Sequence, residues 1–143
     1  MDEELIGLNV HIFSRNIKRT LDNVFNKYHL TSVQSAVLEY IYKRTSKGEK
    51  VYSKDIEKTF DMRRATSAGI LQLLEKQGLI IRELENKDSR LKNIILTKKA
   101  LEVQKEIKRA IEENERKIRK NIPKEEIKQW LEILNKMYNN LNN

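Results

Sequence analysis

The sequence predicts a mainly α-helical protein of one domain, in the order helix-helix-helix-helix-strand-strand-helix-helix. The 143 residues include only 4 glycines and 1 proline, so few positions interrupt a helix. Apolar residues recur at helical spacing through most of the chain. Over residues 80–96 this periodicity gives way to two short segments rich in β-branched residues, which are typical of strands.

The first helix is predicted from about Glu3 to Lys27, where apolar residues form a stripe at helical spacing. The stripe is wide in its early half, and this width favours two packing partners for one helix. Its members are Leu5, Ile6, Leu8, Val10, Ile12, Phe13, Ile17, Leu21, Val24 and Phe25.

The second helix is predicted to start at Thr31, because Thr31 and Gln34 have the spacing of a capping box. Its expected buried positions are Val33, Val37, Leu38 and Ile41. The helix should end in the polar residues 43–50, where Gly48 can supply a left-handed turn.

Two further helices are expected before the strands. Ser53 is the expected N-cap of a short helix through Phe60, and a fourth helix should run from about Arg63 to Gln77. Gly78 is suited to end that helix as a C′ glycine. The apolar face of the fourth helix is Ile70, Leu71, Leu73 and Leu74.

The two strands are predicted over residues 80–84 and 93–96, with a charged loop between them. A hairpin with a basic loop, placed directly after a helix pair, is typical of the wing of a winged helix-turn-helix module.

Two long helices complete the chain. Thr97 is expected to cap the first, which should extend to about Lys120, and Pro123 suits the first position of the second. The inner face of the first is predicted as Ile107, Ala110, Ile111, Asn114 and Ile118. The second carries a strong apolar stripe, expected in a core or a subunit contact: Ile127, Trp130, Leu131, Leu134, Met137, Tyr138 and Leu141.

Composition limits the classes of function. The 29 Lys and Arg residues exceed the 21 Asp and Glu residues and give a net charge of +8. This charge attracts polyanions, among which we expect nucleic acid first and an anionic membrane surface second. The same charge also occurs in many soluble domains. Because Cys is absent, the chain has no disulfide, thiolate zinc site or thiol redox switch. The acidic N-terminus and the lack of a long apolar run predict a cytoplasmic protein without membrane association.

The start of the fourth helix is the main candidate site. Arg63, Arg64, Thr66 and Ser67 are cationic or hydroxyl-bearing, and the residues among them are small. These types suit a helix that enters the major groove of DNA. An ordinary solvated helix start has a similar composition.

The loop between the strands is the second candidate site. Lys87, Arg90 and Lys92 could reach the DNA backbone or a minor groove, and Asp88 could hold the Arg90 guanidinium in a fixed pose. A solvated hairpin with an exposed ion pair is the simpler alternative. The two sites together favour duplex DNA, since both would face one duplex.

Other chemistry has little support. His11 and His29 are the only histidines, and neither has a second ligand at a metal-like spacing. No phosphate-binding glycine loop or convergent catalytic set can be named. We therefore expect no enzyme activity, no cofactor and no metal site.

Three motifs resemble the MarR family of bacterial transcriptional regulators along nearly the whole chain. Residues 30–41 are similar to the opening of that family's second helix, with Leu30, Thr31, Gln34, Leu38 and Ile41. Residues 55–80 resemble its helix-turn-helix, which here ends LEKQGLI. Residues 88–90, followed by Ile94-Ile95-Leu96-Thr97, resemble its wing signature.

The resemblance implies a homodimer, with residues 1–29 and 100–143 as dimerisation helices. It implies a DNA-binding module over residues 30–99, with the wing at 80–97. A pseudo-palindromic operator, a repressor role and release by a small-molecule effector, often anionic or aromatic, also follow from it.

The resemblance further implies roles for single residues. The side chains expected at the major groove are Arg63, Arg64, Thr66 and Ser67. Arg90 is expected at the minor groove, oriented by Asp88. Ala68 and Gly69 depart from the family's larger polar pair, which indicates thinner base readout.

Two other classes stay open from the residues alone. One is an architectural or RNA-binding winged-helix protein without sequence preference. The other is a winged helix whose basic surface meets an acidic protein partner.

Overall fold

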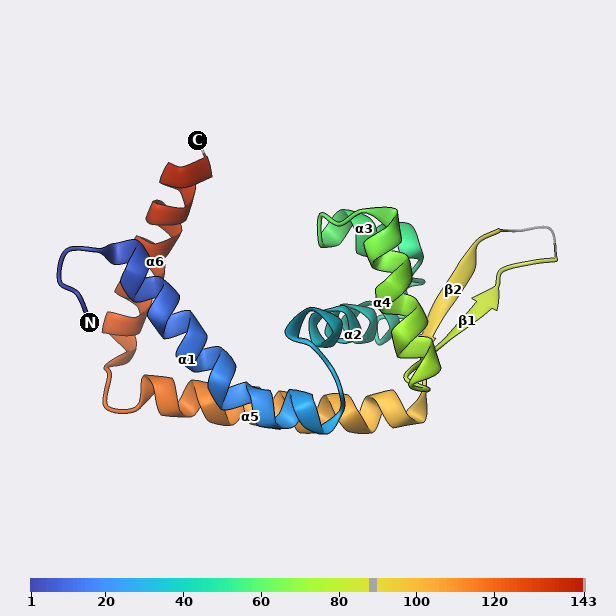
Figure 1. Cartoon of the computed structure of the whole chain (residues 1–143), viewed down its shortest axis with the longest axis horizontal. Coiled ribbons are helices and arrows are strands. Elements are labelled where there is room, and N and C mark those ends of the chain that lie inside the picture. The colour runs from blue at the N-terminus through green and yellow to red at the C-terminus, as the bar shows by residue number, and fades with distance from the viewer. Residues whose placement is uncertain (88–89, 143) are drawn as a thin grey trace.

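The computed structural model describes residues 1–87 and 90–142 and has a lobe joined to an arrangement of long helices (Figure 1). The predicted element order and the mainly helical winged fold are confirmed. The elements are α1 (Ile6–Lys27), α2 (Ser32–Thr45), α3 (Ser53–Thr59), α4 (Arg64–Lys76), β1 (Ile80–Leu84), β2 (Lys92–Leu96), α5 (Lys98–Arg119) and α6 (Lys124–Asn142).

The lobe consists of α2, α3, α4 and the β1–β2 hairpin, which share one apolar core. α3 packs on α4, and α2 packs on β2 and on α5, so the first half of α5 closes the core. The buried apolar residues include Val37, Ile41, Val51, Ile56, Leu71, Leu74, Ile94, Ala100, Val103 and Ile107. Burial of this set is the main favourable term that holds the lobe together.

The expected helix ends are formed by local hydrogen bonds. Thr31 and Gln34 make the capping box, with N···O distances of 3.2 and 2.9 Å. Gly78 has φ +72°, and the Leu79 amide donates to the Leu74 carbonyl at 2.9 Å, which is the bond of a Schellman cap.

The hairpin pairs β1 and β2 antiparallel, with Ile80 opposite Leu96 and Leu84 opposite Lys92. The Ile94 amide donates to the Val51 carbonyl at 2.8 Å, so the chain before α3 lies along the second edge of β2. The hairpin is therefore tied to the lobe through β2.

Some local predictions are wrong. The first helix starts at Ile6, because the Asp2 carboxylate accepts bonds from the amides of Glu4 and Leu5 and holds a turn there. Val33 is 46% exposed instead of buried, since the α2 face that meets the core is centred on Leu38. Ser53 is the first residue of α3, and Tyr52 is its N-cap.

The predicted stripe on the last helix is present but is not covered by the rest of the chain. No described residue of α6 is buried, and Trp130 and Leu131 are about half exposed. Phe13 of α1 meets the Trp130 ring edge-on, with centroids 6.5 Å apart. The described part of the chain thus leaves an apolar face on α6 in water.

We expect alanine substitutions at Gly69, inside α4, and at Gly78, in its C-terminal cap, to change the free energy of unfolding in opposite directions. Gly78→Ala should lower the free energy of unfolding by about 1 kcal/mol, because alanine is strained at a positive φ. Gly69→Ala should raise it by about 0.5–1 kcal/mol, because Gly69 lies inside a helix with open space beside it. Urea unfolding followed by circular dichroism, at one protein concentration, measures both. A Gly78→Ala variant as stable as the wild type would contradict the cap, and a destabilised Gly69→Ala variant would contradict the open space beside Gly69.

Candidate nucleic-acid interface

The start of α4 presents an exposed cationic surface. Arg63 is the N-cap residue, and Arg64, Ala65 and Thr66 occupy the first turn with exposed side chains. The opposite face of the helix, through Leu71 and Leu74, lies in the core. The helix is thus fixed from behind while its first turn faces water.

Ser67 does not share this surface. Its side chain is fully buried, and its hydroxyl lies 3.3 Å from the Ser53 hydroxyl of α3. A buried hydroxyl needs such a partner, and this contact joins the two helices of the helix-turn-helix. The structure therefore gives Ser67 a packing role and takes it out of the expected DNA contacts.

The exposed stripe of α4 also contains a polar residue that the sequence reasoning missed. Ala65, Ala68, Gly69 and Gln72 are spaced at helical intervals and are all exposed. The small residues leave the backbone accessible, and a glutamine amide can make the paired bonds that adenine offers in the major groove. The helical spacing of Ala65, Ala68 and Gly69 is the sequence feature from which Gln72 could have been placed on the same exposed face.

The wing brings the second group of cations to the same lobe. The α4 start and the hairpin loop both lie on the side of the lobe away from α5 (Figure 1). Lys87, Arg90 and Lys92 are exposed. Asp88 lies outside the described residues, so its expected pairing with Arg90 stays a prediction.

Within residues 1–87 and 90–142, no ion pair engages the following side chains: Arg63, Arg64, Lys87, Arg90 and Lys92. By contrast, Arg82 near the base of the hairpin is bound to Glu75 at 2.6 Å. The start of α4 and the wing thus each present exposed cations that make no ion pair with another described side chain.

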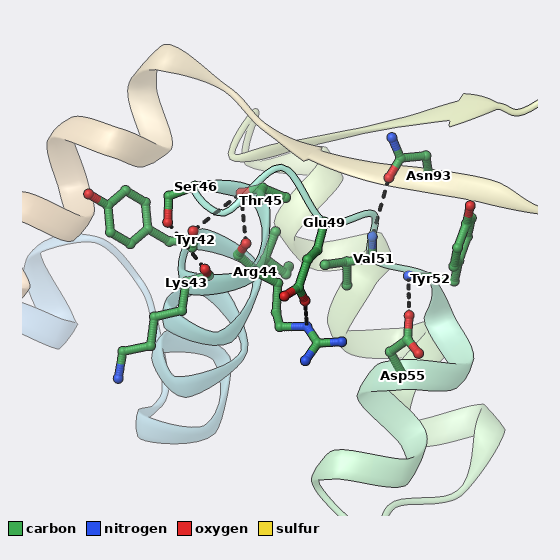
Figure 2. A network of polar contacts seen from close by, with 11 residues as sticks. Tyr42, Lys43, Arg44, Thr45, Ser46, Glu49, Val51, Tyr52, Asp55 and Asn93 are labelled. Atoms are coloured by element: carbon green, nitrogen blue, oxygen red, sulfur yellow. Dashed lines mark hydrogen bonds and ion pairs between the residues drawn. The ribbon is translucent and has the colours of Figure 1, made fainter.

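The loop end of the hairpin strands is bonded to a polar network at residues 49–55 (Figure 2). Val51 donates its amide to Asn93 at 3.4 Å, and Tyr52 donates its amide to the Asp55 carboxylate at 2.8 Å. Glu85 accepts bonds from Lys50 and from the Tyr52 hydroxyl, each 2.8 Å long.

These hydrogen bonds change the acidity of Glu85. The bond from Lys50 and then the bond from Tyr52 hold the pKa of Glu85 below its ordinary value. A carboxyl with a lowered folded-state pKa stabilises the fold above its unfolded pKa, and the contribution is lost as pH falls through the folded value. The stabilisation that Glu85 gives through these bonds is therefore present at neutral pH and is lost as pH falls through the lowered pKa of Glu85.

Among the described residues, no group of three or more acidic or histidine side chains is placed to hold a metal ion. None of the helices described is long and apolar enough to span a bilayer. Both histidines are exposed.

Comparison with known proteins finds a matching family model. A model of the MarR family matches residues 29–91, from the turn before α2 into the wing. No curated protein sequence matches the chain.

Solved structures extend the similarity to nearly the whole chain. The Staphylococcus aureus MepR–DNA complex is 25% identical with a TM-score of 0.82, covering 96% of this chain and 99% of that one. MepR in its DNA-binding conformation is 25% identical with a TM-score of 0.76, covering 96% and 98%. The regulator MarR from Oenococcus oeni is 28% identical with a TM-score of 0.69, covering 94% and 99%.

The contrast between Ser67 and its neighbour can be measured. Ser67→Ala should lower the free energy of unfolding by about 1 kcal/mol, because it removes a buried hydroxyl contact. Thr66→Ala should change it by less than about 0.5 kcal/mol, because that side chain is exposed. Thermal or urea unfolding of the two variants tests this, and equal effects would contradict the burial of Ser67.

Proposed function

Because the chain belongs to the MarR family, we propose that it is a sequence-specific regulator of transcription that binds double-stranded DNA, and that it represses pseudo-palindromic operators. The observation that carries this proposal is the unpaired cationic start of α4 beside a basic wing. The MepR–DNA complex, which has the same fold, supports it.

The proposed DNA contacts of α4 follow from the chemistry of its exposed side chains. Arg63, Arg64 and Thr66 would meet the major groove, where α4 also offers Gln72 to base edges. Phosphate neutralisation by the same cations would supply most of the affinity and make it fall steeply with salt.

The wing would reach the flanking DNA. Lys87 and Lys92 would contact phosphates, and Arg90 would enter the minor groove, where a narrow groove concentrates negative potential. Asp88 is proposed to hold the Arg90 guanidinium in place.

The functional unit in this proposal is a homodimer. The uncovered apolar face of α6 supports it, because an apolar patch of several large side chains marks an interaction surface. We assign dimerisation to residues 1–29 and 100–143, and DNA binding to residues 30–99 with the wing at 80–97. The two copies would then read half-sites about 34–36 Å apart.

Regulation would act on the spacing of the two DNA-binding lobes. A small molecule, anionic or aromatic, that binds one spacing better than the other would shift the population away from DNA. α5 runs from the lobe to the long helices (Figure 1), so a change of angle at one end moves the other.

The function is tested on DNA directly. The purified protein should bind a fragment from upstream of its own gene about 10³-fold or more tightly than a scrambled duplex at physiological salt. Fluorescence anisotropy with unlabelled competitor measures this ratio. Equal affinity for every duplex would favour an architectural role, tighter binding to RNA would favour an RNA-binding one, and failure of the folded protein to bind any nucleic acid would favour a protein partner.

The dimer is tested by adding a charge to the apolar face of α6. Leu131→Glu should convert a dimer into a monomer and weaken operator binding, because a carboxylate cannot be buried unpaired in an apolar interface. Asn139→Glu, on the polar face of the same helix, adds the same charge and should leave the dimer intact. Sedimentation velocity distinguishes the species. A monomeric wild-type protein, or a dimeric Leu131→Glu variant, would contradict the assignment.

A further inference from the structure

Glu85 occupies a particular place in the wing. It follows the last residue of β1, where the loop that carries Lys87 begins. Each of its carboxylate oxygens has a separate partner: Oε1 accepts from the Tyr52 hydroxyl and Oε2 accepts from Lys50 Nζ, both at 2.8 Å. Its side chain is only 21% exposed, although the loop that follows lies in water.

The two partners belong to a segment that is itself fixed to the lobe. Val51, between them, is fully buried, and its carbonyl accepts from Ile94 of β2 at 2.8 Å. On one side, Glu49 pairs with Arg44 of α2 at 2.6 Å, and on the other, the Tyr52 amide is held by Asp55 of α3 (Figure 2). Glu85 therefore bonds to a segment that is itself bonded to α2, α3 and β2.

The hairpin needs such a contact. A two-stranded ribbon is only marginally stable by itself, so the direction of its loop depends on what holds its strands. β2 is bound to the lobe through Asn93 and Ile94. β1 pairs with β2 in the sheet and contacts α4 through the Arg82–Glu75 ion pair, and at its loop end Glu85 ties it to the chain before α3.

We propose that Glu85 is a positioning residue of the wing: its bonds to Lys50 and Tyr52, here called the wing clamp, fix the direction in which the loop presents Lys87 and Arg90 to DNA. The proposal rests on the proposed function, since it assumes that the wing contacts DNA. It adds a residue that carries no charge favourable to DNA and acts through the geometry of the loop.

Electrostatics distinguishes a positioning role of Glu85 from a direct effect of its charge on DNA binding. Removal of a carboxylate near a polyanion strengthens binding, because it removes a Coulomb repulsion. Loss of the wing clamp should weaken binding, because Arg90 would no longer be held at the groove. Glu83 is a matched control: it is an exposed carboxylate two residues earlier on β1, with no ion pair among the described residues.

The first experiment compares operator affinity at one salt concentration. Glu85→Ala should weaken binding about fivefold, the size expected for losing a partly screened charge-assisted contact. Glu83→Ala should leave the affinity unchanged or increase it. Tyr52→Phe, which removes one bond without any change of charge, should weaken binding by a smaller factor.

The second experiment shows that the effect passes through the wing. In an Arg90→Ala background, whose own affinity should be reduced, Glu85→Ala and Tyr52→Phe should weaken operator binding much less than in the wild type, because Lys87 alone is then left for the wing clamp to position. A contact made by Glu85 or Tyr52 directly with DNA would persist in that background. The double-mutant cycle therefore distinguishes positioning from direct contact.

A DNA-free measurement checks the wing clamp itself. The hydrogen bond to Glu85 raises the pKa of Tyr52, so the Tyr52 ring resonance should titrate at lower pH in Glu85→Ala than in the wild type. An unchanged Tyr52 titration would overturn the wing clamp.

The outcomes on DNA separate the two proposals. Wild-type affinity in Glu85→Ala, or an undiminished Glu85→Ala effect without Arg90, would overturn the positioning role while leaving the regulator in place. A wild-type protein that binds no duplex would overturn the proposed function, and the positioning role with it.

Discussion

The structure depends on a hydrogen-bonded junction at the base of the hairpin. The Thr97 hydroxyl donates to the Gly78 carbonyl at 2.7 Å and accepts from the Ala100 amide at 3.2 Å, and the Thr97 amide donates to Leu79. One threonine thus caps α5, closes the hairpin and satisfies the end of α4. Because four elements meet there, the position of α4 relative to α5 and the origin of the wing are set together.

The surface for DNA is a consequence of how α4 is divided between core and solvent. Leu71 and Leu74 are fully buried in the core, and Ser67 is buried on the same side because Ser53 satisfies its hydroxyl. What remains outside is a narrow face of small residues with the arginines at its start. A helix that was more polar on its inner side could not be held tightly enough for its outer side to be presented in a fixed pose.

Local chemistry decided which features could be predicted from sequence. The capping pair of Thr31 with Gln34 and the cap at Gly78 involve residues close in the chain, and both are found as expected. The burial of Ser67 and the bonds of Glu85 were not foreseen, because their partners lie 14 to 35 residues away and only the fold brings them together. The apolar stripe of α6 was read correctly as helix, but no pattern within one chain could show that the same chain leaves it uncovered.

The long helix α5 connects the lobe with α1. Its first half lies in the lobe core through Val103 and Ile107, and its second half packs on α1, where the Thr20 hydroxyl meets the Asn114 side chain at 2.8 Å. Between them, Glu106 accepts bonds from Lys27 and Tyr28 at the end of α1, and these bonds hold the pKa of Glu106 below its ordinary value. The connection between lobe and long helices is therefore a continuous helix braced by charge, not a flexible linker. α5 thus joins the α1 contacts at Glu106 and Asn114 to Thr97, the residue where α4 and the hairpin also meet.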